Sequence, residues 1–321
     1  MRTMKRMITA ALAASIIIIF ASGCGPGFFT YDTGRAIPNV SAQLNDHLRV
    51  SYLGPQGTYT EEAARFFFTD AGEFMPKGSV NEAIADAVSG DADIAVIPQE
   101  NTLGGAVTNY VDALIATENI YVAGEVILPI SQTLMGIPGA SLEDIQTVCS
   151  HAQGIVQSSE WRKRYLPDAV AQEMASTAAA ASYVAETGDR TIAAIAAPGA
   201  AGLYGLSVLA ENVQITDANK TRFYVLSPFR AEGGVRTHAV FVAACGADRI
   251  DDIILRIHNA GLELVALHDR PEGSRLGSYY YLIETENRNG ITEKQLRTIN
   301  AIPEVRCLGS FNVMEKQSGT Q

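Results

Sequence analysis

Residues 49–61, RVSYLGPQGTYTE, decide how the chain begins to fold. Residues 49–53 predict a short strand, and Gly54-Pro55-Gln56-Gly57 predicts a turn. Thr58-x-x-Glu61 is a capping box, which indicates the start of an amphipathic helix. A strand, a glycine turn and a helix start in this order form one α/β unit.

The same alternation continues along the chain. Ser79-x-x-Glu82 opens a second helix that ends near Gly90, and residues 93–97 read as a buried parallel strand. Residues 141–196 then predict a short helix from Ser141, a strand around 148–149, a helix over 152–165, an alanine-rich helix over 177–186 and a strand over 191–196. This alternation predicts a mostly parallel sheet in two lobes.

A second domain follows a change of composition after Pro228. Residues 229–236 are polar and glycine-containing, as is typical of a linker. Beyond them the predicted order is strand 238–244, helix 248–259, strand 262–268, strand 278–284, helix 292–301 and strand 305–313. The fold class is therefore α/β, with a two-lobed domain and a ferredoxin-like βαββαβ domain.

Composition limits the function classes. The chain has 321 residues, of which 47% are hydrophobic, and carries a net charge of −11. This excludes a disordered or fibrous protein, and the acidic balance argues against nucleic acid or an anionic membrane as a partner of the folded body. An anionic ligand must be held by a local site.

The N-terminus has the order of an export signal. Arg2, Lys5 and Arg6 precede an apolar run over 7–21, which ends in Ala21-Ser22-Gly23-Cys24. The last four residues resemble a bacterial lipobox, which implies a signal peptide over 1–23, lipidation at Cys24 and a tether over 24–47. We expect an exported, lipid-anchored protein, periplasmic or at the cell surface; an uncleaved N-terminal anchor is the alternative.

Cysteine and histidine spacing gives no support for a metal. Cys149, Cys245 and Cys307 have no CxxC spacing, and the five histidines form no HxxxH or HExxH pattern. Neither GxxxxGK nor a GxGxxG after a strand occurs, so no nucleotide cofactor is predicted.

Small hydroxyl and amide residues gather where strands end and helices begin. They are Thr58, Asn101, Thr102, Ser150, Gln153, Ser176 and Thr177. Each alone is explained by helix capping, but together on one side of the sheet they predict a carboxylate-binding cleft.

The segment 219–226, NKTRFYVL, places Thr221 and Arg222 at the entrance of an apolar strand that Phe223 anchors. Together with LGPQGTYTEEAA, IPQENTLGGAVTNYVDAL, SHAQGIVQ, STAAAA and AAPGAAGLYGL, it resembles the successive motifs of the prephenate dehydratases, in family order over residues 50–226. The C-terminal module resembles the ACT regulatory domain of that family.

The resemblance implies a catalytic domain over 48–228, similar to type II periplasmic binding proteins, a linker over 229–236 and an ACT domain over 237–316. It implies a carbon–oxygen lyase that converts prephenate to phenylpyruvate, in phenylalanine biosynthesis, without a cofactor. Thr221 would be catalytic, as a hydrogen-bond donor to the leaving hydroxyl. Substrate would be bound by Thr58, Asn101, Thr102, Ser150, Gln153, Ser176, Thr177, Arg222 and Phe223.

Three of these roles stay open. Arg222 either binds a substrate carboxylate or forms a structural ion pair. Glu100 would repel a dianion unless it is protonated or paired, and is interpreted as organising Asn101 and its loop. His151 either orients its loop or contacts substrate.

Departures from the family pattern affect regulation. His268-Asp269-Arg270-Pro271 stands where the family has Glu-Ser-Arg-Pro, and Thr237-His238-Ala239-Val240 replaces its Gly-Ala-Leu start. We expect weak or absent inhibition by phenylalanine. A homodimer is expected by resemblance. The ferredoxin-like order would also bring Cys245 near Cys307, either as a disulfide or as two buried thiols.

Other interpretations remain. An exported solute-binding lipoprotein would need the cleft but not Thr221, and arogenate is an alternative substrate. A degenerate homologue would have neither role.

Overall fold

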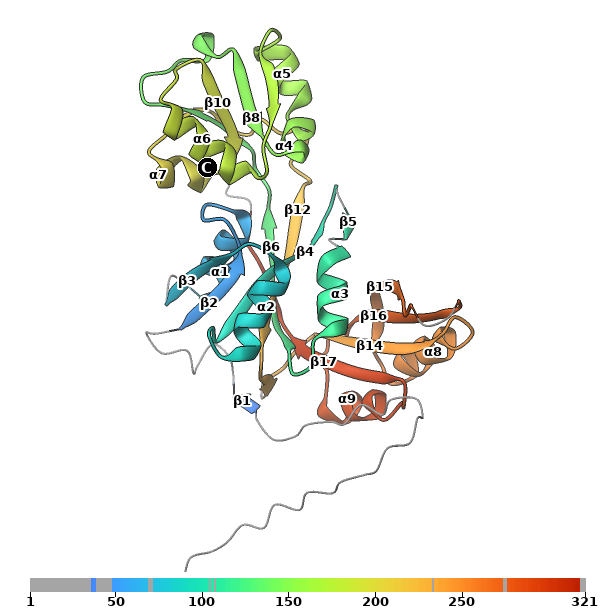
Figure 1. Ribbon diagram of the computed structural model, residues 1–321. Helices are drawn as coiled ribbons and strands as arrows, with labels where there is room; N and C mark the ends of the chain where they lie inside the picture. Colours follow the sequence, from blue (N-terminus) through green and yellow to red (C-terminus); the bar gives the residue numbers. More distant parts are fainter. Residues whose placement is uncertain are drawn as a thin grey trace, which may run out of the picture.

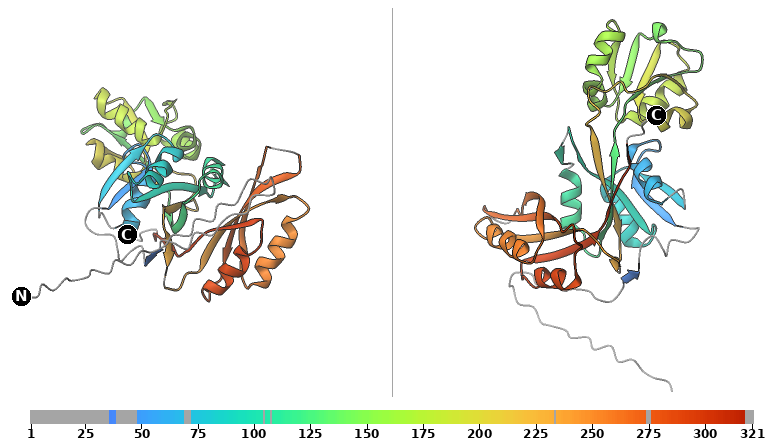
Figure 2. Two further views of the ribbon diagram at one scale, coloured as in Figure 1. Left: turned by 60° about the horizontal axis from the view of Figure 1, so that its bottom comes forward. Right: turned by 180° about the vertical axis from the view of Figure 1, so that it is seen from behind.

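The computed structural model describes residues 36–38, 48–68, 72–103, 105–106, 108–232, 234–273 and 276–317. The predicted signal peptide, Cys24 and all of the tether except 36–38 lie outside the described residues. Figures 1 and 2 show three bodies: a first lobe, a second lobe above it in Figure 1, and a C-terminal domain beside the first lobe.

The first lobe is a mixed sheet with the strand order β18-β6-β12-β4-β2-β3, and β5 pairs with β4. Its strands are β2 (Arg49–Leu53), β3 (Glu73–Lys77), β4 (Ile94–Asn101), β5 (Gly105–Ala106), β6 (Tyr121–Pro129), β12 (Lys220–Ser227) and β18 (Val313–Glu315). Its helices are α1 (Tyr59–Phe68), α2 (Val80–Ser89) and α3 (Thr108–Ala116). The predicted strand at 49–53 and the predicted helix starts are confirmed: the Ser79 side chain accepts a hydrogen bond from Glu82 N, and Gly90 ends α2 in the left-handed conformation.

The second lobe has the strand order β11-β7-β10-β8-β9. Its strands are β7 (Thr133–Gly136), β8 (Thr147–Ser150), β9 (Val170–Glu173), β10 (Ile192–Ala196) and β11 (Ser207–Ala210). Its helices are a 3-10 turn (Leu142–Asp144), α4 (Ala152–Gln157), α5 (Ser159–Tyr165), α6 (Thr177–Thr187) and α7 (Pro198–Tyr204).

Two predictions for the lobes need correction. The single helix over 152–165 is two helices that meet at Ser158, whose hydroxyl donates to Gly154 O at 2.7 Å. The mostly parallel sheet is mixed, because β12 runs antiparallel to both β4 and β6, and β7 runs antiparallel to β10 and β11. These antiparallel strands are the ones next to the two connections between the lobes.

The two connections form a hinge. Residues 130–132 lead from β6 to β7, and residues 211–219 lead back from β11 to β12 (Figure 1). The connections are hydrogen-bonded to each other: Val213 N donates to Gln132 O, and Ile130 N to Asn219 O, each at 2.9 Å. The start of β12 therefore lies at the boundary between the lobes.

The C-terminal domain has the predicted βαββαβ order. It consists of β14 (His238–Gly246), α8 (Ile250–Asn259), β15 (Glu263–Pro271), β16 (Ser278–Glu286), α9 (Glu293–Asn300) and β17 (Val305–Phe311), with the sheet order β15-β16-β14-β17. This is the ferredoxin-like arrangement, so the predicted fold class of two lobes and a ferredoxin-like domain is confirmed.

The first lobe and the C-terminal domain share one apolar core. Val240, Leu282 and Leu308 of the C-terminal sheet belong to the same buried cluster as Tyr110 and Leu114 of α3. The second lobe has separate clusters of its own. In addition, β18 leaves the C-terminal domain and adds a parallel strand to β6 of the first lobe. The predicted domain boundaries remain predictions, but the two domains are packed as one unit.

The disulfide alternative is wrong, and the thiols are free. The strands that carry them, β14 and β17, are antiparallel neighbours as expected, but Cys307 lies opposite Phe241. Cys245 is four residues further along β14 than Phe241, which at roughly 3.3 Å per residue is about 13 Å along the strand. A disulfide needs the two Cα atoms within about 7 Å of each other.

Short β1 (Ala36–Pro38) pairs in parallel with β13 (Arg230–Glu232), so a part of the predicted tether lies against the predicted linker. Among the described residues, no helix is long and apolar enough to cross a membrane.

Candidate active site

The end of β4 and the start of β12 bring two predicted site residues together at the hinge. Asn101 and Thr221 are opposite each other in the ladder. The Asn101 amide nitrogen Nδ2 donates to Thr221 Oγ1 at 2.8 Å and to Asn219 Oδ1 at 2.9 Å. Since the amide occupies an acceptor position of the hydroxyl, the hydroxyl hydrogen of Thr221 is available to donate to a ligand.

A residue of the second lobe completes this group. Gln153, in the first turn of α4, donates through Nε2 to Asn101 Oδ1 at 3.2 Å. His151 caps the same helix, since its Nδ1 accepts from Gln153 N at 3.3 Å. The predicted residues Asn101, Gln153 and Thr221 therefore form one hydrogen-bonded group that spans the two lobes, and His151 orients the loop.

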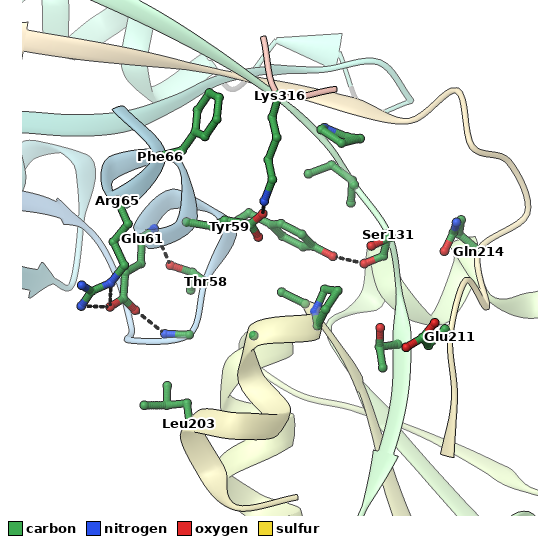
Figure 3. A pocket seen from close by; sticks show the side chains of 18 of the residues that line it. Thr58, Tyr59, Glu61, Arg65, Phe66, Ser131, Leu203, Glu211, Gln214 and Lys316 are labelled. Atoms are coloured by element: carbon green, nitrogen blue, oxygen red, sulfur yellow. Dashed lines mark hydrogen bonds and ion pairs between the residues drawn. The ribbon is translucent and has the colours of Figure 1, made fainter. Parts of the chain in front are cut away.

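Thr58 lines a large open cavity between the lobes. The cavity has a volume of about 1130 Å³, enough for a small dicarboxylate, and lies between the start of α1, the hinge and α7 (Figure 3). Thr58 Oγ1 accepts from Glu61 N at 3.4 Å, the weak cap of α1, and the Tyr59 hydroxyl donates to Ser131 O at the edge of the hinge. Lys316 also lines the cavity, and its Nζ contacts Glu62 Oε1 at 2.8 Å.

The lobes meet a second time beside this cavity. The Tyr204 hydroxyl donates to Gln56 O at 3.0 Å. Gly57 has a φ of 84°, and a Cβ there would lie 2.9 Å from Leu203 Cδ2, so glycine suits both the backbone and the close approach.

Three further predicted residues hold the ends of strands and helices. Thr102 Oγ1 both donates to Lys220 O and accepts from Lys220 N, at 3.0 and 3.1 Å. Ser176 caps α6 by accepting from Ala179 N at 2.9 Å, and Thr177 is the first residue of that helix. The hydroxyls of Thr102 and Ser176 have backbone partners that fix the loops on either side of the lobe boundary.

The structure argues against direct substrate contact for three predicted residues. Ser150 is fully buried and donates to Ile195 O at 2.7 Å, which ties β8 to β10. Phe223 is buried in the core of the first lobe, among residues of β2, β4 and α1. Arg222 follows Thr221 directly and therefore points to the opposite face of the sheet.

Arg222 forms the structural ion pair that the sequence left as an alternative. Its Nε and Nη2 donate to the two oxygens of Glu125 at 2.8 and 2.9 Å, its Nη1 to Glu100 at 3.0 Å and its Nη2 to Glu284 at 2.7 Å. Glu100 is therefore paired, which agrees with an organising role beside Asn101.

Burial and charge act against each other in this cluster. Burial raises the pKa of Glu125 despite the nearby guanidinium. Burial would also raise the pKa of Glu284, but His268 and Arg222 lower it to about 2. Burial alone would lower the pKa of Arg222, but Glu125 and Glu284 raise it above its usual value. Arg222 therefore stays charged and has at least one fully ionised partner.

Sequence reasoning missed Asn219, Gln99, Glu125 and Glu284. Asn219 had a usable signal, because it lies two residues before Thr221 in the quoted segment. Gln99 had the same signal, because it lies two residues before Asn101 in another quoted motif. Glu125 and Glu284 had none, since their contacts to the site depend on pairing between distant strands and between domains. Among the described residues, no group of three or more His, Cys, Asp or Glu side chains is placed to hold a metal ion.

Comparison with known proteins shows to which family the chain belongs. The profile of the family described as prephenate dehydratase matches residues 50–230. The chain belongs to the prephenate dehydratase family. The match covers both lobes, including Asn101, Gln153 and Thr221.

Relatives of this family align well beyond the profile. A bifunctional chorismate mutase/prephenate dehydratase of Neisseria gonorrhoeae (strain ATCC 700825 / FA 1090) is 34% identical over 284 residues, which are 86% of this chain and 78% of that protein. A prephenate dehydratase of Arthrobacter aurescens, solved in complex with L-Phe, is 29% identical with a TM-score of 0.72, over 82% of this chain and 89% of that chain.

The fold is shared more widely. A structure described as GqqA, a novel type of quorum quenching acylase, has a TM-score of 0.73 at 24% identity, over 83% of this chain and 98% of that chain. At this identity the likeness concerns the fold alone.

Proposed function

We propose that the chain is a prephenate dehydratase that acts at the boundary between the two lobes, with Thr221 as the catalytic residue. The observation that carries this proposal is the contact of Asn101 Nδ2 with Thr221 Oγ1, together with Gln153 reaching Asn101 from the other lobe. The family membership supports the reaction, and this hydrogen-bonded group supports the location.

The chemistry needs orientation and one donated hydrogen bond. Prephenate is a dicarboxylate whose ring hydroxyl, with one proton taken up from solvent, leaves as water. The ring carboxylate leaves as CO2, its bonding electrons complete the aromatic ring, and formation of that ring drives the reaction. The role of Asn101 is to orient the Thr221 hydroxyl so that this hydroxyl donates a hydrogen bond to the departing oxygen. Thr58 lines the cavity between the lobes, and Gln153 and Thr177 lie in the first turns of α4 and α6 in the second lobe.

Turnover by the purified full chain tests this function. Prephenate should be converted to phenylpyruvate, and Thr221→Ala should lower kcat at least ~100-fold while prephenate binding changes by less than about threefold, because an interaction made in the transition state is removed. Thr221→Ser keeps a hydroxyl and should retain activity. Binding without turnover in the native chain would support a solute-binding protein instead, and conversion of arogenate to phenylalanine would identify the other substrate.

We further propose that the C-terminal domain is an ACT domain with weak or absent response to phenylalanine. Arg270, in the altered 268–271 segment, donates from Nη2 to Asp112 of α3 at 2.8 Å, so this arginine is engaged in the domain contact. Titration of phenylalanine against turnover tests this, and strong micromolar inhibition would contradict it. A homodimer is proposed from the resemblance, and light scattering in solution would measure it.

The proposal for location is an exported chain held at a membrane by a lipid on Cys24. It rests on the charged and apolar order of residues 1–24. Cys24→Ala should move the chain from the membrane fraction to the soluble or secreted fraction and remove the lipid mass from its N-terminal peptide. An unchanged distribution would contradict lipidation.

A further inference from the structure

Glu284 belongs to β16 of the C-terminal domain, yet its carboxylate contacts two strands of the first lobe. One oxygen accepts from Arg222 Nη2 at 2.7 Å, and the other accepts from the amide of Gln99. The Glu284 side chain is only 4% exposed. Two charge-assisted hydrogen bonds therefore cross the domain boundary in a buried position.

Both partners of Glu284 are close in sequence to the proposed active-site pair. Arg222 follows Thr221 in β12, and Gln99 lies two residues before Asn101 in β4. In the ladder Arg222 is opposite Glu100, and Thr221 is opposite Asn101. Just beyond Arg222 the pairing of β12 with β4 shifts register, whereas its pairing with β6 stays regular from Lys220 to Val225. The contacts of Glu284 therefore add support on the β4 side of β12, where the ladder is irregular. Glu284 thus ties together the two strands next to the point where they hold the reacting hydroxyl.

Glu284 is part of a larger buried cluster of charged and polar side chains. Glu125 and Glu100 also face Arg222, and His268 Nε2 lies 3.6 Å from Glu284 Oε1. Gln99 Nε2 is also within 3.1 Å of the Tyr224 hydroxyl. A buried guanidinium with several partners has one preferred orientation, and removing a charged partner leaves the others to rearrange.

We infer that Glu284 is a positioning residue of the active site: it holds Arg222 and Gln99 so that Thr221 and Asn101 keep the hydrogen-bonded register from which Thr221 donates. This inference rests on the proposed function for its catalytic part only. The C-terminal domain is then a structural component of the catalytic site as well as a neighbour of it.

The test compares Glu284→Gln with Glu286→Gln in the full chain. Both variants make the same substitution on the same strand, but Glu286 contacts His238 and Arg288, away from Arg222 and Gln99. We expect Glu284→Gln to lower kcat about tenfold with KM within about twofold, since small misplacement of a reacting group acts on the chemical step. Glu286→Gln should stay within about twofold in both constants.

Amide hydrogen exchange gives a readout that does not depend on the substrate. Exchange over residues 219–226 should become about tenfold faster in Glu284→Gln and stay unchanged in Glu286→Gln. The reason is that β12 opens locally more often when the contacts of the Glu284 carboxylate are lost. Circular dichroism checks that both variants fold. Should Glu284→Gln fail to fold, Glu284→Asp keeps the charge on a shorter side chain and should give an intermediate exchange rate.

A double variant identifies the route through Arg222. If Glu284 acts through Arg222, adding Glu284→Gln to Arg222→Lys should change kcat by less than about twofold beyond Arg222→Lys alone. Additive losses would exclude the route through Arg222 and leave the one through Gln99. Unchanged exchange over 219–226 in Glu284→Gln would overturn the inference. A native chain that does not convert prephenate would instead refute the proposed function, and the exchange experiment would still decide the positioning role.

Discussion

Asn101 is the residue on which the two lobes and the proposed catalytic hydroxyl converge. Its amide nitrogen donates hydrogen bonds to Thr221 and Asn219. Its amide oxygen accepts from Gln153 and from Leu103 N. An amide is suited to this place because it offers donors and an acceptor without charge. A carboxylate of the same shape would have only acceptors.

We therefore expect Asn101→Asp to lower kcat by at least ~100-fold, because the donor to Thr221 is lost and a negative charge is placed where a dianion binds. Steady-state kinetics with prephenate measures this. Asn101→Ala, which removes the same donor without adding charge, should bind prephenate more tightly than Asn101→Asp. An Asn101→Asp enzyme with native kinetics would show that the amide donor is unimportant.

Among the elements, β17 of the C-terminal domain packs closely against β6 of the first lobe. Gly309 in β17 has a φ of 138°, and a Cβ there would lie 2.3 Å from the backbone oxygen of Val122 in β6. Neither a left-handed backbone nor this gap accepts a side chain.

Gly309→Ala should lower the free energy of unfolding by about 3 kcal/mol, from backbone strain and a clash with main-chain atoms. Gly139→Ala is the matched control, since Gly139 also has a positive φ but nothing lies within 4 Å of the added Cβ. That variant should lose only about 1 kcal/mol. Denaturant unfolding of both variants measures the difference, and equal losses would mean that the approach of β17 to β6 is unimportant for stability.

Local chemistry predicted the elements well and their pairing poorly. The helix starts after Ser79 and Ser176 follow from the capping side chain alone, and both caps are present. Thr221 was predicted from its motif, and its catalytic role stays a prediction. The role of Arg222 stayed open because its carboxylate partners lie 97, 122 and 62 residues away, on three different strands. No local pattern encodes which distant carboxylates a guanidinium will meet.

At the scale of the whole molecule, the buried ion cluster joins two domains and makes their contact sensitive to acid. The folded pKa of Glu284 is about 2, lowered from an ordinary value near 4.5. A lowered carboxyl pKa contributes stability that is fully present above the unfolded value and is lost as the pH falls toward the folded value.

The native chain should therefore be more stable than Glu284→Gln by about 3 kcal/mol at pH 7, and this difference should shrink between pH 4.5 and pH 2. Unfolding in denaturant at several pH values measures the difference. Glu125 acts in the opposite sense, because its raised pKa favours the folded state at low pH. The charge of Glu284 contributes to that raised pKa, so the comparison also includes the smaller change at Glu125. A difference that stays constant down to pH 2 would contradict ionisation of Glu284.

The strand β18 has a consequence for biosynthesis. The first-lobe sheet contains residues from 49 in β2 to 315 in β18, so one of its edge positions is filled by a segment that is translated after all the other strands of that sheet. While the chain is still being translated, β6 lacks the neighbour that covers it in the finished protein. A premature stop codon anywhere before position 313 would thus damage the lobe that holds Asn101 and Thr221 as well as the domain it shortens.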